Sequence, residues 1–299
     1  MFAKRPWNPI MSIGLINLHG LALAGVVFVR PRPIDVALCF AGYLWFGFAS
    51  SLYYHRYLTH KGFELVRPLQ WLFLAGGLIG LSGDPVRWAA THRYHHQRPD
   101  KEGDIHSPTI DGWFYAHFGW IAKLDLDEVD RLRPMAADLR KIWWLRIWEN
   151  PITATIPNLI YAAILLATVG VSGTLWGLYV PLVLSFHFGW MMIASFCHLP
   201  SFGTRGADTP DLSRNIAWLG AFSFGESFHN YHHAYPRRAK HGLAWYEIDP
   251  SKYLLWTFEK LGLAWNVVWD DPRGRVQVPE DVQEYLVPAA AVPEPAPIN

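Results

Sequence analysis

The chain has 299 residues, a length typical of one or two domains, and hydrophobic residues make up 51% of it. Charged residues account for only 17%, below the usual share of about 25%. The formal net charge of +1 gives no basis for nucleic-acid binding, and sixteen tryptophans are typical of a protein that meets a membrane interface. The two cysteines, Cys39 and Cys197, lie in apolar runs and cannot supply a multi-cysteine metal site.

Two uncharged runs near the N-terminus predict membrane-spanning helices. Residues 10–29 form a run of the length that a bilayer-spanning helix needs, roughly 20 residues. A cleaved signal peptide is the alternative, because Ala22-Leu23-Ala24 resembles a cleavage site, but the apolar run continues beyond it. Residues 36–54 form the second run, which ends at a pair of histidines.

Later apolar segments complete the predicted membrane part. Residues 68–83 are short for a span and rich in glycine, so we expect them to dip into the membrane and return. Residues 151–171 and 174–197 predict a third and a fourth span, joined at Ser172-Gly173 as a tight antiparallel hairpin. Residues 215–228 are apolar with few charges and predict an interfacial or half-buried helix that leads into the last histidine cluster.

The order of these segments predicts one domain with its polar face in the cytoplasm. We see no repeat or long linker, so we expect a single domain over residues 1–280 and a disordered Ala/Pro-rich tail over residues 281–299. With four spans, the second and the fourth end on the face where the chain begins. Lys4 and Arg5 indicate that this face is cytoplasmic, whereas Arg30 and Arg32 in an opposite loop count against that orientation.

Eight of the fourteen histidines fall into three short clusters. They are His55 and His60; His92, His95 and His96; and His229, His232 and His233. The last two clusters share the spacing i, i+3, i+4, which places three imidazoles on one helix face. The first pair lies about 140° apart on a regular helix, so that helix must unwind or the two residues must serve different metals.

Imidazole clusters of this kind predict a metal site. Eight nitrogen ligands are too many for one four-coordinate zinc and suit two metals, with iron, copper and zinc all compatible. Surface histidines that bind metal adventitiously, or core histidines with local hydrogen bonds, are the alternative. Two metals in a membrane protein suggest oxygen chemistry on an apolar substrate.

The three clusters, in this order, resemble the HxxxxH, HxxHH and HxxHH boxes of the membrane di-iron fatty acyl desaturases, in particular the Δ9 acyl-CoA and acyl-lipid branch. The likeness covers residues 35–250 and includes Gly225-Glu226, Asn230, Tyr231 and Pro236. It also includes Asp104-Ile105-His106 and His117-Phe118-Gly119-Trp120. The resemblance implies an all-α integral membrane protein with four transmembrane helices and a cytosolic helical cap that carries a histidine-rich di-metal site.

The resemblance also implies which residues form the site. His198, after the fourth span, would be a ninth metal ligand, while Ala194 replaces an asparagine that some relatives have near one metal. The implied ligands are His55, His60, His92, His95, His96, His198, His229, His232 and His233. Glu226, one turn before His229, is expected to be catalytic, and Trp88, one turn before His92, is expected to bind the substrate.

Other histidines receive weaker roles. His106 with Asp104 would orient ligand rings, or form an ordinary loop link. His117 would pack, and His19 and His187 lie inside spans, where ionisable groups are functional candidates by default. His241 belongs to the basic run 237–241, which would hold phosphates of a carrier or a lipid headgroup, or simply face solvent.

The implied activity is oxygen-dependent introduction of a double bond into a fatty acyl chain. Its cofactors would be two iron ions, for which zinc can substitute in a structure, with O2 as co-substrate. The acyl chain would arrive on CoA, a carrier protein or a lipid, and a ferredoxin or cytochrome b5 would donate electrons. The protein would be multi-pass, in contact with membrane lipids, with its active site on the cytoplasmic face. A hydroxylase, ketolase or acetylenase on the same scaffold, a zinc-dependent membrane hydrolase and a metal carrier are the alternatives.

Overall fold

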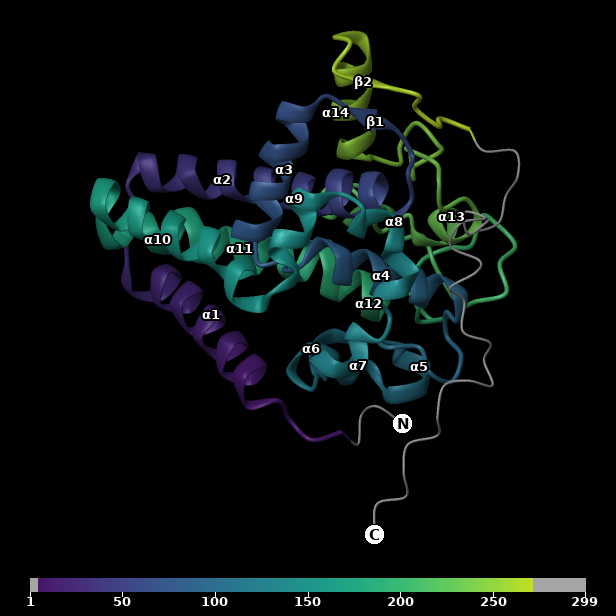
Figure 1. Ribbon diagram of the computed structural model, residues 1–299, viewed down its shortest axis with the longest axis horizontal. Coiled ribbons are helices and arrows are strands. Elements are labelled where there is room, and N and C mark those ends of the chain that lie inside the picture. Colours follow the sequence, from purple (N-terminus) through teal and green to yellow (C-terminus); the bar gives the residue numbers. More distant parts are fainter. Residues whose placement is uncertain (1–4, 271–299) are drawn as a thin grey trace.

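The computed structural model describes residues 5–270 and is predominantly helical, as the sequence predicts (Figure 1). Its described strands, β1 (Glu64–Leu65) and β2 (Ala264–Trp265), form one short antiparallel pair. The tail predicted for residues 281–299 lies outside the described residues. In the labels used here, α marks an α-helix and η marks a 3-10 or π-helical segment.

Three described helical segments are long and apolar enough to cross a membrane. They are α1 (Pro9–Phe28), the continuous run Pro33–Thr59, and the run Pro151–Phe196. Much of α1 is uncovered, with Ile10 and Phe28 each 82% exposed. Because a water-soluble surface rarely presents so much contiguous apolar area, these helices are suited to contact with lipid.

The run Pro151–Phe196 is a hairpin of two arms and not one straight helix. Gly170 adopts a φ of 75°, which breaks α10 (Pro151–Thr174) near its end. Beyond this break, Gly177 lies against Leu165 of the first arm. The hairpin was predicted, but its turn lies at Gly170 and not at Ser172-Gly173, because only Gly170 leaves the helical conformation.

The short apolar segment forms α3 (Arg67–Ile79), which packs against two of the long helices. Trp45 of α2 (Pro33–Phe48) donates a hydrogen bond to Leu72 O at 2.9 Å. Asn158 of α10 donates to Ile79 O at 2.6 Å. A turn with positive φ at Leu81 and Gly83 then reverses the chain into α4 (Pro85–Gln97). This reversal returns the second histidine cluster to the end of the molecule where the first one lies.

Residues 215–228 do not form the predicted helix, and η8 (Ala217–Leu219) is their one regular turn. Asn215 forms isolated bridges with Thr204 and Phe228, and Phe224 and Gly225 both have positive φ. The carbonyl oxygen of Phe224 accepts a hydrogen bond from the buried Arg56 at 3.0 Å instead of from a helical amide. Tertiary contacts therefore override the apolar pattern of this stretch.

The other elements include two that carry histidines of the three clusters, η2 (Ala49–Thr59) and α13 (His229–Ala234), and those that form the second hairpin arm and the remainder of the fold. The latter are α5 (Pro108–Asp111), η3 (Tyr115–Gly119), α6 (Trp120–Ala122), α7 (Leu126–Asp130), η4 (Arg133–Ala136), α8 (Ala137–Arg140), α9 (Trp143–Arg146), η5 (Ile147–Glu149), η6 (Leu175–Tyr179), α11 (Val180–Phe186), η7 (His187–Met191), α12 (Met192–Phe196) and α14 (Pro250–Lys260). In Figure 1, α2 and α10 lie side by side, and α4 and α13 lie toward the opposite end of the molecule.

Candidate metal centre

The first histidine pair is aligned by a π-helical segment. In η2 the amide of His60 donates to the carbonyl oxygen of His55 at 3.2 Å, a hydrogen bond between residues five apart. The two side chains therefore lie one turn apart on the same side, with ring centroids separated by 4.9 Å. A departure from regular α-helix was one of the two solutions that the sequence allowed, and η2 provides it.

Nine histidines lie in two neighbouring groups, and within each group the ligand nitrogens lie within 4.8 Å of one another. The five-histidine group is His55, His60, His92, His96 and His232, and the four-histidine group is His95, His198, His229 and His233. These are the nine residues that the sequence suggested as ligands. The structure brings all of them together, and their role in holding metal stays a prediction.

Two helices each contribute to both groups. On α4, His92 and His96 are one turn apart and join the five-histidine group, while His95 points into the four-histidine group. On α13 the division is reversed, with His232 in the five-histidine group. The spacing i, i+3, i+4 thus serves two sites at once, because adjacent residues on a helix point in different directions.

The chemistry of both groups fits cations. The Nε2 atoms of His60 and His95 are buried and make no hydrogen bond, and the Nε2 atoms of His198 and His229 face each other at 3.0 Å. Burial, with the neighbouring histidines, holds the pKa of His60 well below its ordinary value. A neutral imidazole is the form that binds metal. Buried imidazole nitrogens that converge on one another in this way are well suited to a shared metal ion.

Four imidazole rings of the two groups are oriented by carboxylates on their Nδ1 side. The pairs are His95 with Asp104 at 2.9 Å, His198 with Asp100 at 2.8 Å, His233 with Asp211 at 3.2 Å, and His55 with Glu226 at 2.5 Å. Each Nδ1–H donates to its carboxylate, which leaves the Nε2 atom on the side where a metal ion could bind. This includes the orienting role expected of Asp104.

The three aspartates stay ionised although they are buried. Burial opposes ionisation of Asp104, but the electrostatic attraction and hydrogen bond of His95 outweigh it and hold the pKa of Asp104 below its usual range. The same balance, with His198 as partner, lowers the pKa of Asp100. The four-histidine group is therefore surrounded by fixed negative charge.

Glu226 lies beside the five-histidine group, but it does not reach this position by sharing a helical face with His229, as the sequence predicted. It precedes α13 and so does not share a helical face with His229. Its Oε2 accepts from His55, and its Oε1 accepts from Ser51 Oγ at 2.5 Å and from Arg56 Nη2 at 3.1 Å. Burial opposes its ionisation, but His55, His241 and Arg56 hold the pKa of Glu226 below its usual range. Its catalytic role stays a prediction.

The sequence analysis placed His241 at the surface, but the structure buries it beside the five-histidine group. This side chain is only 1% exposed, so it cannot hold phosphates at the surface as the basic run suggested. Its ring centroid lies 4.6 Å from that of His232, and its Nδ1 lies 3.5 Å from Glu226 Oε2. The loop that carries it is positioned by Asp249, which accepts from the amide of His241 at 2.8 Å. No local pattern indicates this contact, because it depends on residues distant in sequence.

Three other histidines form a separate row outside both groups. His19 Nε2 lies 3.1 Å from His187 Nε2, and His187 Nδ1 lies 3.2 Å from His117 Nε2. His117 Nδ1 in turn lies 2.9 Å from Ser195 Oγ. The row joins α1, η3 and η7, so these residues have a packing role visible in the structure.

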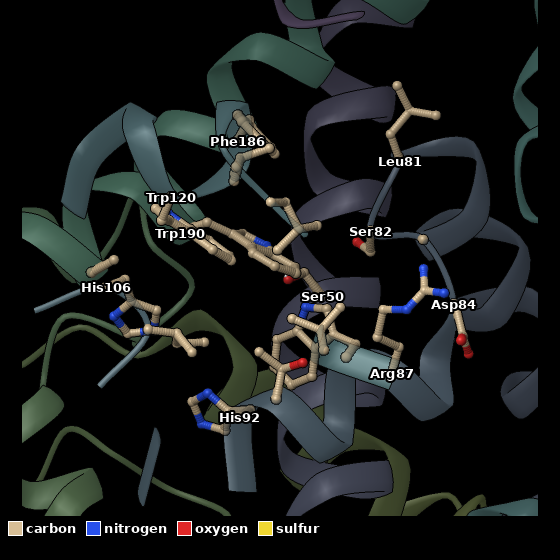
Figure 2. Close-up of a pocket in the computed structure, with 18 of the residues that line it drawn as sticks. Ser50, Leu81, Ser82, Asp84, Arg87, His92, His106, Trp120, Phe186 and Trp190 are labelled. Atoms are coloured by element: carbon tan, nitrogen blue, oxygen red, sulfur yellow. The ribbon is translucent and has the colours of Figure 1, made fainter. Parts of the chain in front are cut away.

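A cavity of about 460 Å³ opens onto both histidine groups. His92 and His95 line it together with Trp88 and Ala194, and most of the wall is apolar. Figure 2 shows His92 and His106 on one side of this pocket and Leu81 and Asp84 on the other. The Trp88 ring stacks on His92 with centroids 5.1 Å apart. Trp88 thus lies where a substrate-binding residue would lie, and that role stays a prediction.

Bilayer-length apolar helices, two buried histidine groups and an adjoining apolar pocket define a class of membrane protein with a histidine-rich metal site. The family model for fatty acid desaturase matches residues 34–269, and the chain belongs to this family. It is therefore an oxidoreductase that acts on fatty acyl chains.

Curated relatives support the same assignment. Icosanoyl-CoA 5-desaturase of Limnanthes douglasii is 36% identical over 271 residues, which cover 89% of this chain and 74% of the relative. Delta-9 acyl-lipid desaturase 2 of Arabidopsis thaliana is 37% identical over 272 residues, covering 89% and 86%. Acyl-CoA C20 Delta5-desaturase of Anemone leveillei is 37% identical over 271 residues, covering 88% and 83%.

Proposed function

We propose that this fatty acyl desaturase uses O2 and two iron ions, one in each histidine group, to introduce a double bond. The observation that carries this proposal is the opening of one apolar cavity onto both groups. Imidazole nitrogens suit iron, and two bound irons would supply the activation of O2 and the redox equivalents. Zinc would fit the same nitrogens without supporting that chemistry.

The residues of the chain would provide position and a dry environment. The nine histidines would hold the metals, and the four carboxylates would fix the rings that they contact. The apolar wall would exclude water from the acyl chain, and the Trp88 ring would limit its path beside His92. Glu226 would act through His55 and not by direct contact with substrate, because His55, Ser51 and Arg56 occupy its carboxylate oxygens.

The arrangement in the membrane that we propose has four spans and a helical cap on the cytoplasmic side, within a single domain over residues 1–280. The exposed apolar surface of α1 and the two-armed run Pro151–Phe196 support it. In such an arrangement, η2 and α12 both end on the side of the cap, where the histidines lie.

The acyl carrier and the electron donor are also matters of proposal. The relatives include both acyl-CoA and acyl-lipid desaturases, and their names place the double bond at Δ5 or Δ9. We propose an acyl chain on CoA, a carrier protein or a membrane lipid. Two external electrons per O2 would come from a ferredoxin or a cytochrome b5.

The decisive experiment is expression in a host that lacks its own unsaturated fatty acids, followed by gas chromatography and mass spectrometry of total lipids. We expect a new monounsaturated acid with the wild type and none with His96→Ala. Iron in the purified protein, measured by plasma mass spectrometry after iron supply, should approach two per chain. A hydroxylated, keto or acetylenic product would identify another reaction on the same scaffold. One metal per chain, or zinc with full activity, would overturn the di-iron proposal.

A further inference from the structure

We propose that the two metal positions are electrically unequal, and that the four-histidine group holds the ferric ion when the centre has lost one electron. This inference rests on the proposed two-iron function and states which of the two irons is oxidised first. It follows from the distribution of buried charge, because different numbers of carboxylates contact the histidines of the two groups.

Three carboxylates adjoin the four-histidine group, each on a different ligand. Asp104 contacts His95, Asp100 contacts His198 and Asp211 contacts His233. The Asp100, Asp104 and Asp211 side chains are at most 4% exposed, so water screens them little. The described ion pairs of these aspartates are all with histidines, and no lysine or arginine among residues 5–270 forms an ion pair with them. The exposed Arg205 donates a hydrogen bond to the backbone oxygen of Asp211 and not to its carboxylate.

The five-histidine group has one such carboxylate, Glu226 on His55. Glu226 also contacts the guanidinium of Arg56, which in turn contacts Asp249 at 3.0 Å. Two carboxylates and one guanidinium leave one net negative charge.

The consequence follows from charge balance in a buried site. With one divalent ion in each group, the five-histidine group carries one positive charge in excess and the four-histidine group one negative charge in excess. Removing an electron from the four-histidine group brings it to neutrality, whereas removing one from the five-histidine group doubles its excess. Because uncompensated buried charge is costly, the first electron should leave from the four-histidine group.

Ligand basicity acts in the same direction. A carboxylate that accepts from Nδ1–H makes the ring a stronger donor to metal through Nε2. Three of the four ligands in the four-histidine group have such a partner, against one of five in the other group. Stronger donors stabilise the higher oxidation state.

The test is a stepwise oxidation of the purified protein loaded with two ⁵⁷Fe ions and fully reduced under anaerobic conditions. Ferricyanide accepts one electron per molecule and becomes ferrocyanide, while one ferrous ion becomes ferric. Mössbauer and electron paramagnetic resonance spectra follow the titration. We expect two separate one-electron steps, with a ferrous–ferric state dominant after one equivalent.

Two variants assign the ferric ion to its group. Asp100→Asn removes one charge, and its amide can donate to Ser107 Oγ, which has Thr109 Oγ1 as a second partner. It should narrow the interval between the two midpoint potentials. Glu226→Gln removes a charge at the other group and should widen that interval. Asp211→Asn repeats the first comparison at a second carboxylate.

The outcomes separate this inference from the proposed function. A protein with fewer than two irons would contradict the proposed function itself. Oxidation of both irons in one step would overturn only the inference that the two metal positions are unequal. The same holds if the interval between the two midpoint potentials is unchanged or wider in Asp100→Asn and Asp211→Asn. If the carboxylates were merely structural, all three variants would lose iron without shifting the interval in opposite directions.

Discussion

At the scale of single residues, the histidines of α4 and α13 should be hard to replace, because each of these helices contributes to both groups. His232 lies 3.0 Å from His55 and 2.8 Å from His96 through Nε2 atoms, at the centre of the five-histidine group. We expect His232→Ala to reduce turnover by at least about 100-fold, because loss even of a ligand's hydrogen-bonding partner costs about 10- to 100-fold. The measured iron content should fall from two ions per chain toward one. Activity within twofold of the wild type would contradict the ligand assignment.

His187 provides a contrasting case. Both of its ring nitrogens contact other histidines, but none of these belongs to either metal group. We expect His187→Ala to keep both irons and most activity. It should lower the free energy of unfolding by about 1–3 kcal/mol, because partners of the row lose their hydrogen bonds. Thermal unfolding in detergent measures the second effect, and loss of iron would show that the row belongs to the centre.

At the scale of elements, the local patterns predicted what depends on neighbours in sequence. The histidine spacing correctly placed two clusters on helices α4 and α13, and apolar length located the long helices. The π-helical turn at His55 and His60 was only one of two open solutions. The loop over residues 215–228 was predicted wrongly, because the buried Arg56 takes the carbonyl oxygen of Phe224 from across the molecule.

Close packing between α3 and η2 gives a prediction at this scale. A Cβ added at Gly77 would overlap the ring of Tyr54, which packs edge-on against Trp88 in turn. We expect Gly77→Ala to destabilise the protein by about 1–3 kcal/mol, the usual cost of overpacking. The matched control is Gly20→Ala in α1, where nothing lies within 4 Å of the added atom. Unfolding midpoints in detergent should fall for the first variant only, and equal midpoints would show that α3 shifts freely.

At the scale of the whole molecule, the sequence predicted which histidines come together and which tryptophan lines the pocket, but not the charges that surround them. The nine histidines could be proposed because their motifs are local or match a family. The roles of Asp100, Asp211 and His241 depend on loops that converge only in the folded chain. The spacing argument for Glu226 assumed a helix that begins only at His229. Contacts between residues distant in sequence therefore determine the charges around the site, whereas local sequence patterns determine where its histidines lie.

The shape of the cavity gives the last prediction. The Trp88 ring lies between His92, on which it stacks, and Trp190, whose centroid is 5.0 Å away. Both tryptophans line the cavity together with His92 and His95, so an acyl chain bound there would lie against them. Trp88→Ala should therefore loosen the position of the chain and give mixed products, including hydroxylated ones, because hydrogen abstraction depends on placement to about 1 Å.

Two further variants isolate this effect from loss of stability, which Trp88→Ala should also cause by about 3 kcal/mol or more. Trp88→Phe keeps a flat ring against His92 and removes an indole N–H that has no hydrogen-bond partner, so it should keep a single product. Trp113→Ala removes a tryptophan that stacks on His117 outside the cavity, and it should leave the products unchanged. Gas chromatography of the products measures all three. A single unchanged product from folded Trp88→Ala would mean that other residues of the cavity wall position the acyl chain.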